Sequence, residues 1–129
     1  MIAGVVNEFR EATIDLTLRG PAGHEERFEF VVDTGFTGGL TLHWAVAAAL
    51  ELPRLAWKPA VLGDGSTVML MLSEAELLWN GAPRIVPVNI SDGGLLLGME
   101  LLEGHDLYLR AIPDGEVRIS AVRDAATSD

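Results

Sequence analysis

The stretch FEFVVDTGFTGGLTL, residues 28 to 42, runs an apolar segment directly into an acid. Val31 and Val32 have the character of a buried strand, and Asp33 follows them at once, before Thr34 and Gly35. A buried carboxylate is costly unless another group pairs with it or the protein uses it. Asp33 therefore either caps a turn or is placed there for chemistry.

The composition indicates one globular domain. The chain has 129 residues, 49% of them hydrophobic, which is enough for a sizeable core. Its formal net charge of -10 argues against a nucleic-acid or anionic-membrane surface, since both require clustered Lys and Arg. Cysteine is absent, which excludes thiolate nucleophiles and Cys-ligated zinc. Without the pattern of a signal peptide or a membrane helix, we expect a cytoplasmic protein.

Alternating apolar residues predict a mainly β chain. Ile14, Leu16 and Leu18 share one face of a strand within residues 13–20, and residues 27–33 form its hairpin partner. Further strands are expected at residues 5–9, 68–78, 84–90, 106–112 and 116–122, and short helices within residues 40–53 and 95–104. We expect one domain over residues 1–122, followed by a polar, disordered tail at 123–129.

Turn residues divide these elements. Asp64-Gly65 predicts a type I′ hairpin turn, which needs positive φ at both positions, and Asn80-Gly81 predicts another turn. Pro53 is expected to end the alanine-rich helix. Pro87 cannot donate a ladder hydrogen bond, so its strand is expected to be edge-like or bulged.

Four chemistries place an Asp at the end of a strand. An aspartyl phosphate needs a nearby Lys or a second Asp, which DTGFTG lacks. Metal binding needs converging ligands, and a serine triad needs a nucleophile elbow. Neither pattern is formed by His24, His43 and His105 or by Ser66, Ser73 and Ser91. The fourth is hydrolysis by two carboxylates that share a proton, for which one Asp-Thr/Ser-Gly per half-site suffices.

Three segments of the sequence resemble the retroviral-type (retropepsin-like) aspartic proteases. FVVDTG (30–35) is similar to their catalytic loop, LGDGS (62–66) to their glycine-rich flap, and LLLGMELL (95–102) to their apolar-Gly segment with a short helix. The resemblance covers about residues 2 to 122. It implies a retropepsin-like closed β-barrel or sandwich with one or two short helices, active as a symmetric homodimer.

The resemblance also implies roles for individual residues. Asp33 would be the catalytic aspartate, Thr34 would brace the loop against the partner's loop, and Gly35 would let the backbone turn. The remaining implied residues of the substrate site are Gly63, Asp64 and Gly65 at the flap tip, Phe36 after the triplet, and Leu97 and Gly98 beneath the loop. Phe36 departs from the small residue usual in retroviral members. No metal or cofactor is implied.

One Asp-Thr-Gly triplet implies two chains. The implied activity is that of an aspartic endopeptidase in which Asp33 of each copy supplies one carboxylate and a peptide or protein substrate binds as an extended strand. In this family the termini commonly join the dimer interface, so residues 2–6 and 117–122 are candidates. Two alternatives stay open: a catalytically silent family member that binds peptides or assembles, which Phe36 favours, and an unrelated monomeric β module.

Overall fold

The computed structural model describes residues 1–123. Apart from Arg123, the tail predicted at 123–129 lies outside the described residues. The mainly β architecture with two short helices is confirmed, and none of the described helices is long and apolar enough to cross a membrane. The strands are β1 (Ile2–Val6), β2 (Ala12–Arg19), β3 (Glu25–Val32), β4 (Leu40–His43), β5 (Ala56–Val61), β6 (Thr67–Trp79), β7 (Ala82–Ser91), β8 (Leu96–Leu97), β9 (His105–Leu109) and β10 (Glu116–Ala121), and the helices are α1 (Trp44–Ala49) and α2 (Met99–Leu102).

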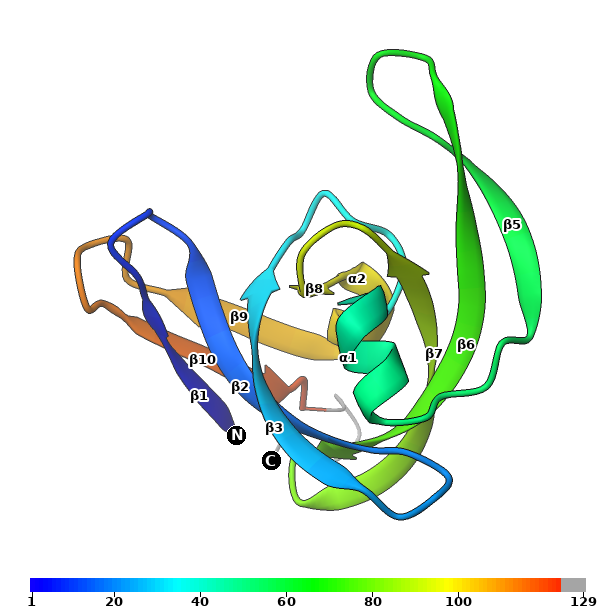
Figure 1. Ribbon diagram of the computed structural model, residues 1–129. Coiled ribbons are helices and arrows are strands. Elements are labelled where there is room, and N and C mark those ends of the chain that lie inside the picture. Colours follow the sequence, from blue (N-terminus) through cyan, green and yellow to red (C-terminus); the bar gives the residue numbers. More distant parts are fainter. Residues whose placement is uncertain (124–129) are drawn as a thin grey trace.

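All of these strands belong to one hydrogen-bonded sheet in the order β5-β6-β7-β4-β8-β3-β2-β1-β10-β9. A further pairing joins β6 to β2, so the strands from β6 to β2 in this order form a closed hydrogen-bonded circuit. Two groups of strands lie outside the circuit (Figure 1). One is β5, which forms a hairpin with β6, and the other is the set β1, β10 and β9, called here the terminal arm.

The core lies against the inner faces of these strands. Phe30, Leu18 and Leu97 have no exposed surface, and they belong to one continuous cluster of buried apolar side chains. Within β2, Ile14, Leu16 and Leu18 are buried and Asp15 is exposed, as the period-two pattern predicts, but Thr13 on the opposite face is also buried.

The first strand begins and ends earlier than its predicted range of residues 5–9. The oxygen of the Asn7 side chain accepts hydrogen bonds from the backbone N–H groups of Phe9 and Glu11, each at 2.9 Å. Arg10 takes a left-handed conformation with φ of 62°. The prediction was wrong beyond Val6 because a side-chain amide takes up the backbone groups that a strand would need.

The two hairpin turns differ in type. Asn80 and Gly81 have φ of 51° and 84°, as a type I′ turn requires. In the β5–β6 hairpin only Gly65 has a positive φ, 85°, and its N–H donates to the Leu62 carbonyl. The type I′ prediction for Asp64-Gly65 was therefore wrong, since the loop is longer by one residue and needs positive φ only at its last position.

Pro87 lies within a strand, and Pro53 lies beyond the end of a helix. β7 pairs with β6 along its length, but β4 joins its other side only from Val88 onward, so Pro87 lies where β7 has one neighbour, as an edge-like position requires. The alanine-rich helix stops well before Pro53. Glu51 has a left-handed φ of 52°, so the backbone leaves the helix there, and the prediction that Pro53 ends it was wrong.

Two phenylalanines test the position of the core. We expect Phe30→Ala, at a site with 0% exposure, to lower the free energy of unfolding by about 3–5 kcal/mol. Phe9→Ala, at a site with 73% exposure, should change it by less than about 0.5 kcal/mol. Urea denaturation of both variants measures this difference, and equal losses would contradict the described core.

Candidate active site

Asp33 begins the loop of residues 33–39 that connects β3 to β4. Its N–H donates to the Leu97 carbonyl at 2.9 Å and continues the parallel pairing of β3 with β8. Its carbonyl accepts from Phe36 N–H at 3.1 Å, and its Oδ1 accepts from Gly35 N–H at 2.9 Å. The backbone and one carboxylate oxygen of Asp33 are thus fixed by three N–H···O bonds.

The rest of the loop is tied to the start of α2. No side chain caps this helix at Gly98, and carbonyls of the loop take over the capping. Three backbone bonds make the connection: Gly98 N–H to Gly39 O at 2.8 Å, Met99 N–H to Phe36 O at 2.8 Å, and Glu100 N–H to Gly38 O at 3.1 Å. Loop and helix therefore hold each other in place, although they are about sixty residues apart in the chain.

Two polar groups of the triplet remain available. Within the described residues, Asp33 Oδ2 and the Thr34 hydroxyl make no hydrogen bond, and Thr34 is exposed. Gly35 is also exposed and serves Asp33 through its N–H alone. The loop thus presents one carboxylate oxygen and one hydroxyl to the outside of the chain.

The half-buried ring of Phe36 packs across two glycines. A Cβ added at Gly98 would lie 2.4 Å from Phe36 Cδ2, and a Cβ added at Gly38 would lie 2.6 Å from Phe36 Cζ. The absence of side chains at these positions makes room for a bulky residue after the triplet. Phe36 therefore packs against Gly38 of its own loop and against Gly98 at the start of α2.

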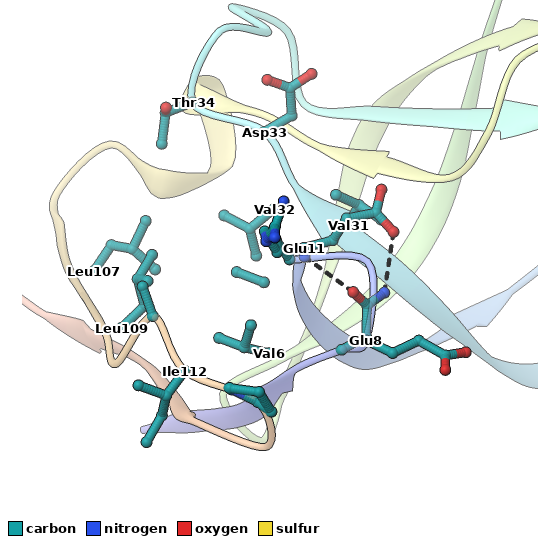
Figure 2. A pocket seen from close by; sticks show the side chains of 15 residues that line it. Val6, Glu8, Glu11, Val31, Val32, Asp33, Thr34, Leu107, Leu109 and Ile112 are labelled. Carbon is teal, nitrogen blue, oxygen red and sulfur yellow. Dashed lines mark hydrogen bonds between the residues drawn. The ribbon is translucent and has the colours of Figure 1, made fainter.

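A hollow of about 610 Å³, called here the Asp33 hollow, opens beside the triplet. Asp33 and Thr34 lie at one end of it, and Val6 and Ile112 lie at the other (Figure 2). Phe36 does not line it. Its further lining includes Val32, Leu107 and Leu109 as apolar residues and Glu8 and Glu11 as acids.

Sequence reasoning missed most of this lining, which comes from the ends of the terminal arm. The turn after β1 and the segment after β9 carry no motif of a functional site. One signal was available: Asn7 favours a turn, because its side chain bonds to its own backbone, so NEFRE could have been recognised as a loop.

The predicted flap tip lies apart from this hollow. Gly63, Asp64 and Gly65 connect β5 to β6 at the end of a hairpin that projects from the body (Figure 1), and none of them lines the Asp33 hollow. The exposed apolar side chains Val61 and Leu62 flank the tip. In one copy the structure therefore brings Asp33 and Thr34 together but does not bring the flap tip to them.

The two other predicted residues lie beneath the loop. Leu97 has 0% exposure and lies in the buried core, and its contact with the loop is through its carbonyl, which accepts the Asp33 N–H. Gly98 starts α2 beneath Phe36. Among residues 1–123 no three His, Cys, Asp or Glu side chains are grouped so that they could hold a metal ion.

The packing of Phe36 predicts a coupling between two substitutions. Gly38→Ala should destabilise the protein by about 1–3 kcal/mol, because the new methyl meets the Phe36 ring. In the Phe36→Ala background the same change should cost much less, since the nearest remaining atom, Asn89 Nδ2, is 3.5 Å away. Gly98→Ala should stay costly in both backgrounds, because Gly38 O lies 2.3 Å from its Cβ. Denaturant titrations of the variants measure the coupling; additive losses would contradict this packing.

The flap tip predicts a shifted titration. The Ser66 hydroxyl and, next in effect, the Ser66 N–H donate hydrogen bonds to Asp64 Oδ1 and lower the pKa of Asp64 below its usual 3.8. These bonds favour the ionised form, so the stabilisation they give is present above the usual pKa and is lost as the pH falls through the lowered one. Ser66→Ala should raise the pKa of Asp64 towards 3.8, as followed by NMR titration. An unchanged pKa would contradict this tip geometry.

Comparison with known proteins supports the fold alone. No protein-family model and no curated protein matches the chain. Among solved structures, EIAV protease complexed with the inhibitor HBY-793 matches with a TM-score of 0.57 and 17% identity, over 75% of this chain and 89% of that one. A retropepsin-like aspartic protease from Rickettsia conorii matches with a TM-score of 0.55 and 18% identity, over 95% of this chain and 91% of that one. The chain therefore has the fold of the retropepsin-like aspartic proteases.

Proposed function

We propose that this protein is an aspartic endopeptidase that acts as a homodimer, with Asp33 of each copy as one of two catalytic carboxylates. One observation carries the proposal: in this fold, the only Asp-Thr-Gly of the sequence forms a loop whose backbone is fixed, and no described residue bonds to its Asp33 Oδ2 or Thr34 hydroxyl. A single carboxylate cannot act as both acid and base in one step. Glu8 and Glu11 also line the Asp33 hollow but belong to no Asp-Thr-Gly triplet, so we assign the second carboxylate to Asp33 of another copy.

Two such carboxylates held close together would share one proton, because both cannot be ionised at short distance. The ionised Asp33 takes a proton from water, and the water oxygen attacks the carbonyl carbon of the peptide bond. The protonated Asp33 polarises the carbonyl oxygen, and a proton then passes to the leaving nitrogen as the C–N bond breaks.

Other residues of this chain would serve the same reaction. The Gly35 N–H on Asp33 Oδ1 keeps the carboxylate oriented, and the free Thr34 hydroxyl is available to the loop of the partner subunit. The flap tip at Gly63–Gly65 would close over an extended peptide and exclude water. Val61 and Leu62, both exposed, would add apolar contacts, which favours substrates with apolar side chains.

We also propose that residues 1–122 form a single domain and that the protein is cytoplasmic. The second proposal is supported by the lack of cysteine, which suits a reducing compartment. Phe36, which favoured the alternative of a catalytically silent, peptide-binding relative, packs across Gly38 and Gly98 and does not line the Asp33 hollow, which weakens that alternative.

Peptide cleavage tests the proposal. Wild-type protein should cut members of a mixed peptide library, and Asp33→Asn should reduce the rate by at least about 10²–10⁴-fold, since Asn keeps the shape but cannot share a proton. Asp92→Asn, at an exposed carboxylate outside the triplet, is the matched control and should keep full activity. The wild-type rate should follow a bell-shaped profile on the acid side. Equal cleavage by wild type and Asp33→Asn, or a profile flat from about pH 4 to 8, would refute the mechanism.

A further inference from the structure

The edge of the sheet beside Asp33 is open. Among residues 1–123 the strand order ends at β5 on one side and at β9 on the other, so each of these strands has one neighbour there. β5 belongs to the projecting hairpin, whereas Leu107 and Leu109 of β9 line the Asp33 hollow. An open edge presents unpaired N–H and C=O groups on which another strand can pair.

The strands expected to form the dimer interface offer no such edge. β1 pairs with β2 on one side and with β10 on the other. β10 in turn has β1 and β9 as neighbours. Residues 2–6 and 117–122 therefore pair with each other inside one chain, and an exchange with a partner would break these pairings. Within the terminal arm, β9 alone is left open.

Alternating bonds decide which groups of β9 face this edge. The Arg110 N–H donates to the Glu116 carbonyl at 2.9 Å, and the Val122 N–H donates to the Gly104 carbonyl at 2.8 Å. In an antiparallel ladder such pairs alternate, so residues 106 and 108 also bond to β10. The backbone groups of residues 105, 107 and 109 consequently point outward, where the described residues provide no strand.

The side chains of β9 separate into two faces. Asp106 and Tyr108 of β9, with Arg110 directly after it, form an exposed face of an acid, an aromatic ring and a base, and Arg118 of β10 stacks 4.2 Å over the Tyr108 ring. Leu107 and Leu109 lie on the other face. When two copies of this segment lie antiparallel, the acid of each can lie opposite the base of the other. We propose that a second copy of this chain pairs its β9 antiparallel to the first, with the two-fold axis at Tyr108, so that Arg110 lies opposite the partner's Asp106 on both sides of the axis. This proposal rests on the proposed function and identifies its dimer interface.

The same register matches the other face and the backbone. Leu107 comes to lie opposite the partner's Leu109, so the apolar walls of the two hollows become continuous. Residues 107 and 109 are also those with outward N–H and C=O groups, so each such pair exchanges two hydrogen bonds. The contact uses the same patch on both copies, as a two-fold interface must.

Neighbouring registers are less favourable. An axis at Asp106 sets two carboxylates directly opposite each other, which is destabilising. An axis at Leu107 places Asp106 opposite the partner's Tyr108 and Arg110 opposite the partner's Gly104, so neither charge is paired. Neither Asp106 nor Arg110 forms an ion pair within residues 1–123. Two copies with a net charge of -10 each repel, so an interface that pairs its own charges is needed.

Charge reversal tests this interface. Sedimentation should show a dimer for the wild type and a dissociation constant raised by roughly tenfold or more for Arg110→Asp, which sets acid against acid twice. Adding Asp106→Arg to that chain restores complementarity and should restore the dimer. Arg84→Asp makes the same charge change on an exposed part of β7 and is the matched control. A monomeric wild type would overturn the proposal. So would an Arg110→Asp variant that associates as tightly as the wild type and the Arg84→Asp control.

Cross-linking tests the register. The chain has no cysteine, so any disulfide formed by Tyr108→Cys must join two copies at that position. Cα atoms of a directly opposed pair without ladder bonds are about 4.5 Å apart, within the reach of a disulfide. Mild oxidation should therefore cross-link Tyr108→Cys, whereas Asp106→Cys should stay uncross-linked. The opposite result would overturn the Tyr108-centred pairing.

Cleavage assays on the same samples separate this inference from the proposed function. If the dimer responds to charge reversal and its rescue but no peptide is cut, the interface stands and the endopeptidase proposal fails. If peptides are cut and the reversals leave both dimer and rate unchanged, the endopeptidase proposal stands and the β9 interface fails. When both are right, Arg110→Asp loses activity at low protein concentration and the double reversal regains it.

Discussion

The hydrogen bonds between the Asp33 loop and residues 97–100 are the constraint on which the site depends. Asp33 N–H continues the sheet onto β8, and three N–H groups at the start of α2 take their acceptors from the loop. Without the loop, α2 would begin with unsatisfied donors, because no side chain caps it. Without α2, the loop would have few fixed points. The acid that interrupts an apolar strand is therefore positioned by backbone groups, at no cost to its free carboxylate oxygen.

The division of the sheet gives the site its surroundings. The circuit from β6 to β2 holds the fully buried residues Phe30 and Leu97 and fixes the strands that carry Asp33. The parts outside the circuit, β5 and the terminal arm, bear the exposed apolar side chains Val61 and Leu109. β5 has no buried residue, and elements with few buried contacts open locally at low cost, whereas the terminal arm adds Val117 and Ile119 to the core. In the proposed enzyme, catalysis would use the closed part of the sheet, and flap closure and association would use β5 and the terminal arm.

The sequence predicted the elements whose pattern is local. The alternation in β2, the helix over the alanines and the Asp33 loop follow from spacing within a few residues. The errors lie where a side chain or a distant strand intervenes: Asn7 ends β1 early, and Gly65 alone carries the positive φ of its turn. The space that accommodates Phe36 could not be predicted, because it depends on Gly98, which approaches only when the sheet has formed.

The open edge belongs to this last class, since no local pattern distinguishes β9 from β10. Both alternate, and both follow a turn with a left-handed residue, Gly104 and Asp114 respectively. The difference is that β10 also pairs with β1, whereas β9 pairs with β10 alone among the described strands. That pairing also places the free edge on the side of the chain where the unused carboxylate oxygen lies, through Leu107 and Leu109 in the wall of the Asp33 hollow. The proposed half-site at Asp33 and the open sheet edge at β9 are therefore neighbours, and in our proposal one second copy would complete both.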